Sequence, residues 1–306
     1  MEEGRAGVGE FSGQGAGVTN EPKSSSKVFY VGHSLTNTDV PWIVKGVAES
    51  VKLTNSYKQQ LNVGAALRAQ WEGPAKFNTI PVWNAALGRD EELGANPLTE
   101  LPLGQYDALV LTEAIPVDKQ ADSALYFGNY YDLAVKGRKG IDVYLYETWD
   151  YVVSDNWAAW RAKLDDWRPV WEKIADDVMA KRPDGPKVHI VPGGQALAAL
   201  HDAIKSKGKV GTLTDIKQVF HDDIHLNNVG NYYIGLVHFA TLYRRDPSGG
   251  GPVSAGPFKR QAQVVMDQPT RSALQALAWQ VVRAYPRSGV SRVPAGAPEK
   301  AKKRSG

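Results

Sequence analysis

Five short apolar runs, separated by longer segments, most constrain how this chain can fold. They are KVFYV at 27–31, YKQQLNV at 57–63, YDALVLT at 106–112, DVYLYE at 142–147 and KVHIVP at 187–192. The first and third runs are apolar almost throughout, which is typical of central parallel strands that are buried on both faces. The second run alternates in character and is a weaker strand signal. The runs predict five β-strands in this order.

Helical patterns lie between several of these runs. We expect helices over 39–53, 122–137 and 157–181, the first of them capped by Asn37 or Thr38 with Pro41 in its first turn. The third has apolar residues at alternating spacings of three and four, which predicts one core-facing stripe made of Trp157, Trp160, Leu164, Trp167, Trp171, Ile174 and Val178. Alternating strands and helices imply parallel strands with right-handed crossovers. The prediction is an α/β fold, a three-layer α/β/α sandwich with a five-stranded, flavodoxin-like parallel sheet.

The composition changes near both ends of the chain. Residues 1–26 are rich in Gly, Ser and Glu, and residues 291–306 form a basic, polar tail. Such segments bury too little apolar surface to offset their ordering entropy, so both are predicted to be disordered around a single domain at 27–290. The first 26 residues lack the apolar core of an intact signal peptide. A periplasmic or secreted location is favoured if a signal peptide has been removed, and the compartment otherwise stays open.

Charge and composition argue against several classes of function. The chain has 36 basic and 33 acidic residues, a net charge of +3, which gives no electrostatic case for nucleic acid or a membrane surface. No apolar run approaches the roughly 20 residues of a membrane span. The absence of cysteine excludes disulfides, thiolate metal sites and a cysteine nucleophile. His221, Asp222 and His225 come nearest to a metal site without convincing spacing, so no metal or cofactor is expected, and the oligomeric state stays open.

Two polar segments suggest nucleophilic catalysis. Ser34 follows the first predicted strand directly, where a serine is either a helix cap or a nucleophile. Near the other end of the domain, His225 stands three residues after Asp222, just before a predicted helix. A serine nucleophile needs a base, and the base needs a partner that holds its tautomer. An Asp-x-x-His segment can supply both from one loop.

These segments resemble the first and last sequence blocks of the SGNH, or GDSL-type, hydrolases. The matching stretches are GHSL at 32–35 and DDIHLNNVG at 222–230, where the family has Gly-Asp-Ser-Leu and Asp-x-x-His. The resemblance implies that Ser34 is the nucleophile, His225 the base and Asp222 its orienting carboxylate. Asp223 is the rival candidate for the orienting role. His33 replaces the aspartate of the family pattern.

The resemblance also implies an oxyanion hole. In the family it is built from the amide of the serine, a glycine amide after the second strand and an asparagine side chain after the third. Ser34 and Gly64 match the first two donors, but Glu113 stands where the asparagine is expected. A carboxylate there would repel an oxyanion. Glu113 is therefore either kept protonated by burial, turned away toward substrate or backbone, or part of a site altered for another reaction.

The function expected from these residues and the resemblance is that of a serine esterase. It would remove an O-acyl group, with O-acetyl as the favoured case, from a carbohydrate through an acyl-enzyme. Trp71 and Trp149 follow predicted strand ends, where open α/β sheets bind ligands, so both are expected to contact substrate together with Glu113 and His33. The alternatives are acyl transfer to a sugar hydroxyl by the same triad and a non-catalytic carbohydrate-binding relative. No nucleic-acid partner is expected.

Overall fold

A computed structural model describes residues 21–73, 81–84, 89–254, 256 and 264–290. The strands are β1 Ser25–Gly32, β2 Thr54–Leu61, β3 Pro81–Asn84, β4 Arg89–Glu92, β5 Ala108–Leu111, β6 Asp142–Glu147 and β7 Val188–Pro192. The α-helices are α1 Asp39–Ser50, α2 Leu67–Glu72, α3 Pro97–Glu100, α4 Ser123–Gly137, α5 Trp157–Ala180, α6 Gly193–Lys207, α7 Asn228–Tyr243 and α8 Gln268–Ala284. Short 3-10 turns occupy Leu101–Leu103, Val117–Lys119, Val153–Asp155 and Ile216–Val219.

The main sheet has five strands in the order β2-β1-β5-β6-β7, and every neighbouring pair is parallel. The chain therefore leaves β1 toward one edge of the sheet and returns to the other side of β1 with β5. This is the flavodoxin-like order, and the reversal creates a switch point beside the carboxyl end of β1. The predicted α/β fold class and the five predicted strands are confirmed.

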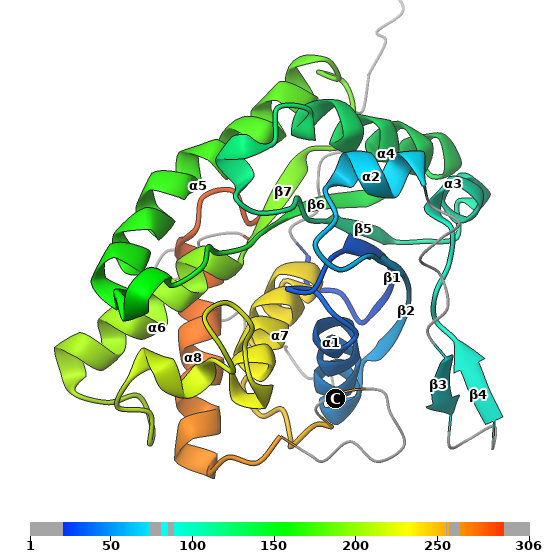
Figure 1. Ribbon diagram of the computed structural model, residues 1–306. Helices are drawn as coiled ribbons and strands as arrows, with labels where there is room; N and C mark the ends of the chain where they lie inside the picture. The colour runs from blue at the N-terminus through cyan, green and yellow to red at the C-terminus, as the bar shows by residue number, and fades with distance from the viewer. Residues whose placement is uncertain (1–20, 74–80, 85–88, 255, 257–263, 291–306) are drawn as a thin grey trace, which may run out of the picture.

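Residues of the central strands alternate between two hydrophobic cores. Val28 and Tyr30 pack with α1, α6, α7 and α8, whereas Phe29 and Val31 pack with α4 and much of α5. Figure 1 shows α4 and α5 on one face of the sheet and α1, α7 and α8 on the other. Burial on both faces explains why the first and third runs carry almost no polar residue. The three-layer α/β/α architecture is confirmed.

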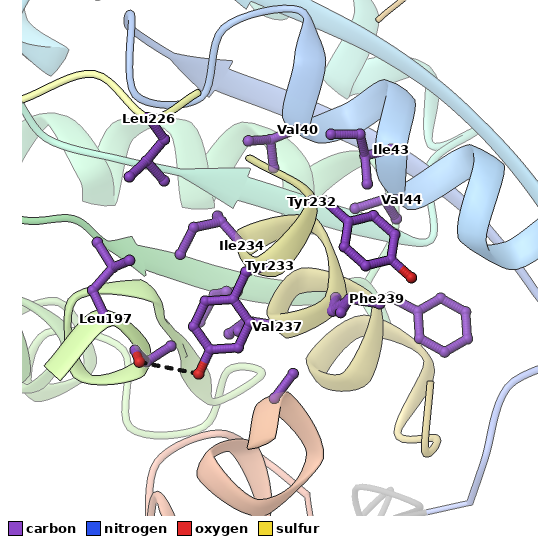
Figure 2. Packing of buried hydrophobic residues seen from close by; sticks show 14 of the residues in the cluster. Val40, Ile43, Val44, Leu197, Leu226, Tyr232, Tyr233, Ile234, Val237 and Phe239 are labelled. Atoms are coloured by element: carbon purple, nitrogen blue, oxygen red, sulfur yellow. Dashed lines mark hydrogen bonds between the residues drawn. The ribbon is translucent and has the colours of Figure 1, made fainter. Parts of the chain in front are cut away.

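Helix α7 is deeply buried in the protein. Its side chains from Tyr232 to Tyr243 are all buried, which is typical of a helix enclosed by other elements. Figure 2 shows α7 packed against Val40 and Ile43 of α1. The Tyr233 hydroxyl donates to the carbonyl of Ala196 at 3.0 Å. The predicted stripe on α5 is confirmed as well, with every member buried except the partly buried Trp157.

Several boundaries differ from the prediction. β1 begins at Ser25, and the Lys23 amide donates to the carbonyl of Tyr243 at 2.9 Å, so order begins before the expected boundary at residue 27. Thr38 holds the N-cap position of α1, but its side chain caps no backbone amide. The antiparallel hairpin β3–β4, set apart from the main sheet in Figure 1, was not predicted. The expected disorder of 1–20 and 291–306 concerns segments outside the described residues.

No described helix combines the length and the hydropathy that a membrane-spanning segment needs.

Candidate active site

Ser34 lies on a tight turn between β1 and α1. The amides of Thr36 and Asn37 both donate to the carbonyl of His33 at 2.9 Å, and Asn37 has a left-handed φ of 45°. A Cβ on Gly32 would lie 2.4 Å from Thr36 Oγ1, so glycine is needed for the turn to fold back on the strand. Ser34 itself is half-buried, and within the described chain its amide donates to no protein acceptor.

Asp222 and His225 form a hydrogen-bonded pair on the loop before α7. His225 Nδ1 lies 2.8 Å from Asp222 Oδ2, and Asp222 Oδ1 accepts from the amides of Ile224 at 2.9 Å and His225 at 2.6 Å. Burial acts to raise the pKa of Asp222, but these backbone bonds and the imidazole outweigh it and lower the pKa to about 2. The carboxylate is therefore ionised near neutral pH, where it holds the proton of the neutral imidazole on Nδ1 and leaves Nε2 as an acceptor.

The structure places Asp222, and not Asp223, on the imidazole. The carbonyl of Asp223 accepts from the amide of Val152 at 2.8 Å, and its side chain is exposed.

The loop that carries Asp222 and His225 is held by contacts from several elements. The Trp149 indole donates to the carbonyl of Ile224 at 2.7 Å, and Asn227 caps α7 through its bonds to the amides of Val229 and Gly230.

Ser34 and His225 open onto the same cavity, which has a volume of about 620 Å³. It lies at the carboxyl end of the sheet, beside β1, where the strand order reverses, and this is the usual ligand position in open α/β sheets. Trp149 contributes to its wall although the residue is only 1% exposed, because its indole lies between the strand end and the loop that carries His225. Trp149 thus lies at the predicted position.

Gly64 lies on the turn that follows β2, next to a residue that lines the cavity, although Gly64 itself is not part of the lining. The Ala65 amide donates to the carbonyl of Asn62 at 3.2 Å, and Gly64 has a left-handed φ of 69° that favours glycine. Its neighbour Val63 lines the cavity. Within the described residues the Gly64 amide donates to no protein acceptor, so this N–H group is available as a donor.

Glu113 is buried behind the site and does not line the cavity. Its Oε1 accepts from the amides of Ala114 at 2.7 Å and Leu67 at 3.0 Å, so the carboxylate holds the start of α2. Burial raises its pKa, although the two amides act in the opposite direction. The expected contact between Glu113 and substrate is wrong, because the side chain turns toward the backbone. The open choice is decided in favour of the turned-away arrangement.

His33 and Trp71 also lie outside the cavity, which corrects their predicted role in contacting substrate. His33 is buried; its Nε2 donates to the carbonyl of Glu113 at 2.9 Å, and its Nδ1 accepts from the Leu35 amide at 3.3 Å. Burial lowers its pKa to about 4, so it is a neutral structural residue. Trp71 packs edge-to-face on Tyr130 with ring centroids 4.9 Å apart, because α2 directs it into the core beside α4.

One polar wall of the cavity was not predicted from the sequence. Asn37, Asp39 and Asn231 line it together, from the start of α1 and the first turn of α7. The sequence did contain a hint of this wall. α1 follows a strand end and α7 follows the loop that carries His225, and the first turns of such helices face the site at this edge of the sheet. The contact between the two turns could not be inferred, since it joins residues 192 positions apart.

No protein-family model matches the chain, and no curated protein matches its sequence. Among solved structures, the chain is similar to the crystal structure of a DUF4886 family protein from Bacteroides uniformis. The TM-score is 0.55 at 17% sequence identity, over 84% of this chain and 95% of that chain. At this identity the likeness concerns the fold alone.

Proposed function

We propose that this protein is a serine esterase of the SGNH type. The observation that carries the proposal is the Asp222–His225 pair, 2.8 Å apart, which opens onto the same cavity as Ser34. The three residues occur in the order of that superfamily, on a sheet whose strand order suits it. A nucleophile, a base and an orienting carboxylate at one edge of the sheet are the components that acyl transfer needs.

In the proposed reaction Ser34 Oγ attacks the ester carbonyl carbon, and its proton passes to His225 Nε2. The tetrahedral intermediate then expels the alcohol, which takes that proton, and the acyl group remains on Oγ. A water molecule, deprotonated by Nε2, attacks the acyl carbon. The bond between the acyl carbon and Oγ then breaks, the proton on Nε2 passes to Ser34 Oγ, and the carboxylic acid is released. Asp222 stays ionised and stabilises the imidazolium that forms in each half-reaction.

The backbone amides of Ser34 and Gly64 are the proposed oxyanion donors. Each such donor contributes roughly 10²–10³ in rate. The asparagine of the family has no counterpart at Glu113, but the carboxylate of Glu113 is bound to the amides of Leu67 and Ala114. Glu113 therefore does not argue for a non-catalytic relative, because its carboxylate is bound to backbone amides and does not face the place where we propose that the oxyanion forms.

Hydrolysis is favoured over acyl transfer by the openness of the site. The side chains of Asp222 and His225 are each 43% exposed, so water has access to an acyl group on Ser34. A transferase has to keep water away from that intermediate. The cavity walls mix apolar side chains with amides, which suits a small acyl group on a polar alcohol, and we propose an O-acetyl ester of a carbohydrate as the substrate.

The test is hydrolysis of p-nitrophenyl acetate by the wild-type protein and the Ser34→Ala variant. We expect turnover by the wild type and a loss of at least about 10³-fold in the variant, since the nucleophile is absent. The thermal unfolding midpoint should change little. A fluorophosphonate should label Ser34, as shown by peptide mass spectrometry. Turnover that survives in the variant, or label on another residue, would refute the assignment.

A further inference from the structure

The wall of the cavity formed by α1 and α7 carries a polar cluster of Asn37, Asp39 and Asn231. Asp39 is 8% exposed, and its Oδ2 accepts from Asn231 Nδ2 at 3.3 Å and, at a longer 3.5 Å, from Asn37 Nδ2. Its Oδ1 accepts from Thr38 Oγ1 at 3.2 Å. One nearly buried carboxylate therefore orients two side-chain amides on the wall of the catalytic cavity.

The two amides keep unused hydrogen-bonding groups after they contact Asp39. Each asparagine has a second N–H and a carbonyl oxygen, and in the described part of the chain neither carbonyl oxygen accepts a protein hydrogen bond. A donor beside an acceptor on each amide matches a hydroxyl group, which both donates and accepts. Because the shared carboxylate fixes both amides, a hydroxyl-bearing ligand would find the groups already oriented.

The charge of the cluster limits the ligand further. A carboxylate on the cavity wall disfavours phosphate or carboxylate groups on the substrate. The described residues contain no group of three His, Cys, Asp or Glu side chains that could hold a metal ion. Amides around a single carboxylate therefore suit neutral hydroxyl groups better than an anion or a metal ion.

We propose that Asn37, Asp39 and Asn231 form a subsite that binds hydroxyl groups of a neutral polyol, the alcohol part of the ester. This inference rests on the proposed esterase function and assigns specificity to residues outside the triad. Asn231 contacts the hydroxyls directly, and Asp39 positions the two amides and repels acidic alcohols. The alcohol leaves from this wall of the cavity after Ser34 takes the acyl group.

The first test compares two esters that differ in their alcohol. A monoacetylated methyl glucoside offers hydroxyls to the subsite, whereas p-nitrophenyl acetate offers none. Asn231→Ala should lower kcat/KM for the glucoside ester about tenfold more than it lowers kcat/KM for p-nitrophenyl acetate. Asn129→Ala, a partly buried asparagine on α4 outside the cavity, is the matched control. Equal losses on both esters, or no loss on either, would overturn the subsite.

The second test uses the charge of Asp39. The wild type should prefer the monoacetylated methyl glucoside over the matching glucuronoside, and Asp39→Asn should reduce that preference because the repulsion is removed. A role in folding alone would not change the ratio between two substrates. If the wild type instead prefers acetylcholine, and Asp39→Asn abolishes that preference, the cluster binds a cation and the proposal is wrong.

A binding measurement separates this inference from the proposed function. Methyl glucoside is titrated into the Ser34→Ala protein and into the Ser34→Ala/Asn231→Ala protein, with saturation-transfer NMR as the readout. Binding that Asn231→Ala abolishes supports the subsite even if the wild type hydrolyses no ester, in which case the esterase proposal fails alone. Hydrolysis of p-nitrophenyl acetate without binding of methyl glucoside overturns the subsite and leaves the esterase standing.

Discussion

Both carboxylate oxygens of Asp222 contact one short segment, 224–225, so a single residue shapes the loop and orients the base. One oxygen accepts from backbone amides and the other from the imidazole of His225. Backbone amides also orient the Glu113 side chain, whose carboxylate accepts hydrogen bonds from the amides of Leu67 and Ala114 behind the site. The position of each carboxylate is therefore set by the donors that the backbone supplies to it.

Asp222→Asn should lower kcat far more than Asp223→Asn. An asparagine can donate to Nδ1 and thereby favour the wrong imidazole tautomer, and such a change costs up to about 10⁴-fold in a comparable triad. Asp223 contacts the loop through its backbone carbonyl, so its amide variant should keep activity within about threefold of the wild type. Steady-state kinetics with p-nitrophenyl acetate measure both, and equal losses would contradict the assignment.

Glu113→Gln should retain kcat and KM, because a glutamine oxygen can still accept from the amides of Leu67 and Ala114. Glu113→Ala should lower the free energy of unfolding by about 1–3 kcal/mol, since two buried amides lose their acceptor. Urea unfolding and the pH dependence of kcat test this. An alkaline loss of activity in the wild type that disappears in Glu113→Gln would instead identify Glu113 as a proton donor to the oxyanion.

Helices α1 and α7 position the two halves of the candidate site, and they approach closely at Gly235. A Cβ at this position would lie 2.4 Å from Cγ2 of Ile43. α1 begins shortly after Ser34, and α7 begins shortly after His225. The distance between these two helices therefore sets how the nucleophile and the base face each other.

Gly235→Ala should destabilise the fold and lower activity. Alanine normally favours a helix over glycine by about 1 kcal/mol, but overpacking here costs about 1–3 kcal/mol and separates α1 from α7. Ile43→Ala removes the colliding methyl group, so the double variant should lose less stability than the sum of the two single variants. Thermal and urea unfolding measure the cycle. A higher melting temperature for Gly235→Ala alone would show that the helices accommodate the methyl group.

At the scale of the whole molecule, Glu147 lies where the end of β6 meets α5 and α6. Its Oε1 accepts from Gln195 Nε2 at 3.0 Å, and its Oε2 has no partner among the described residues. Burial raises its pKa to about 8, although the bond from Gln195 and the charge of Arg168 act in the opposite direction. Glu172 and Asp165, which are also nearby, add to the increase. The folded protein therefore keeps a proton that the unfolded chain releases at its ordinary pKa of 4.5.

Stability should fall as pH rises toward 8, because deprotonation favours the unfolded state within this window. A single group of this kind contributes a slope of roughly 1 kcal/mol per pH unit. Glu147→Gln keeps an acceptor for Gln195 and cannot ionise, so the difference between variant and wild type should grow from pH 5 to pH 8. Urea unfolding at several pH values measures it, with Asp223→Asn as an exposed control. Parallel curves would exclude an ionising Glu147.

The order of strands and helices, the Ser34 corner and the Asp222–His225 pair could all be predicted from the sequence. These features are local. The apolar sequences of β1 and β5 reflect burial on both faces, and the three-residue spacing places the carboxylate on the imidazole. The sequence also showed that Glu113 replaces an expected asparagine. It could not show which way the Glu113 side chain points, because one of the amides that donate to it belongs to Leu67, which a different loop brings to this place.

Which polar side chains share the cavity depends on the packing of distant segments. His33 and Trp71 follow strand ends as predicted, yet burial against neighbouring elements removes both from the site. Asn231 enters it because α7 packs against α1, which brings its amide to Asp39 across 192 positions of sequence. A strand end or helix start specifies which edge of the sheet a residue reaches. The direction in which its side chain points depends on the partners that distant segments supply.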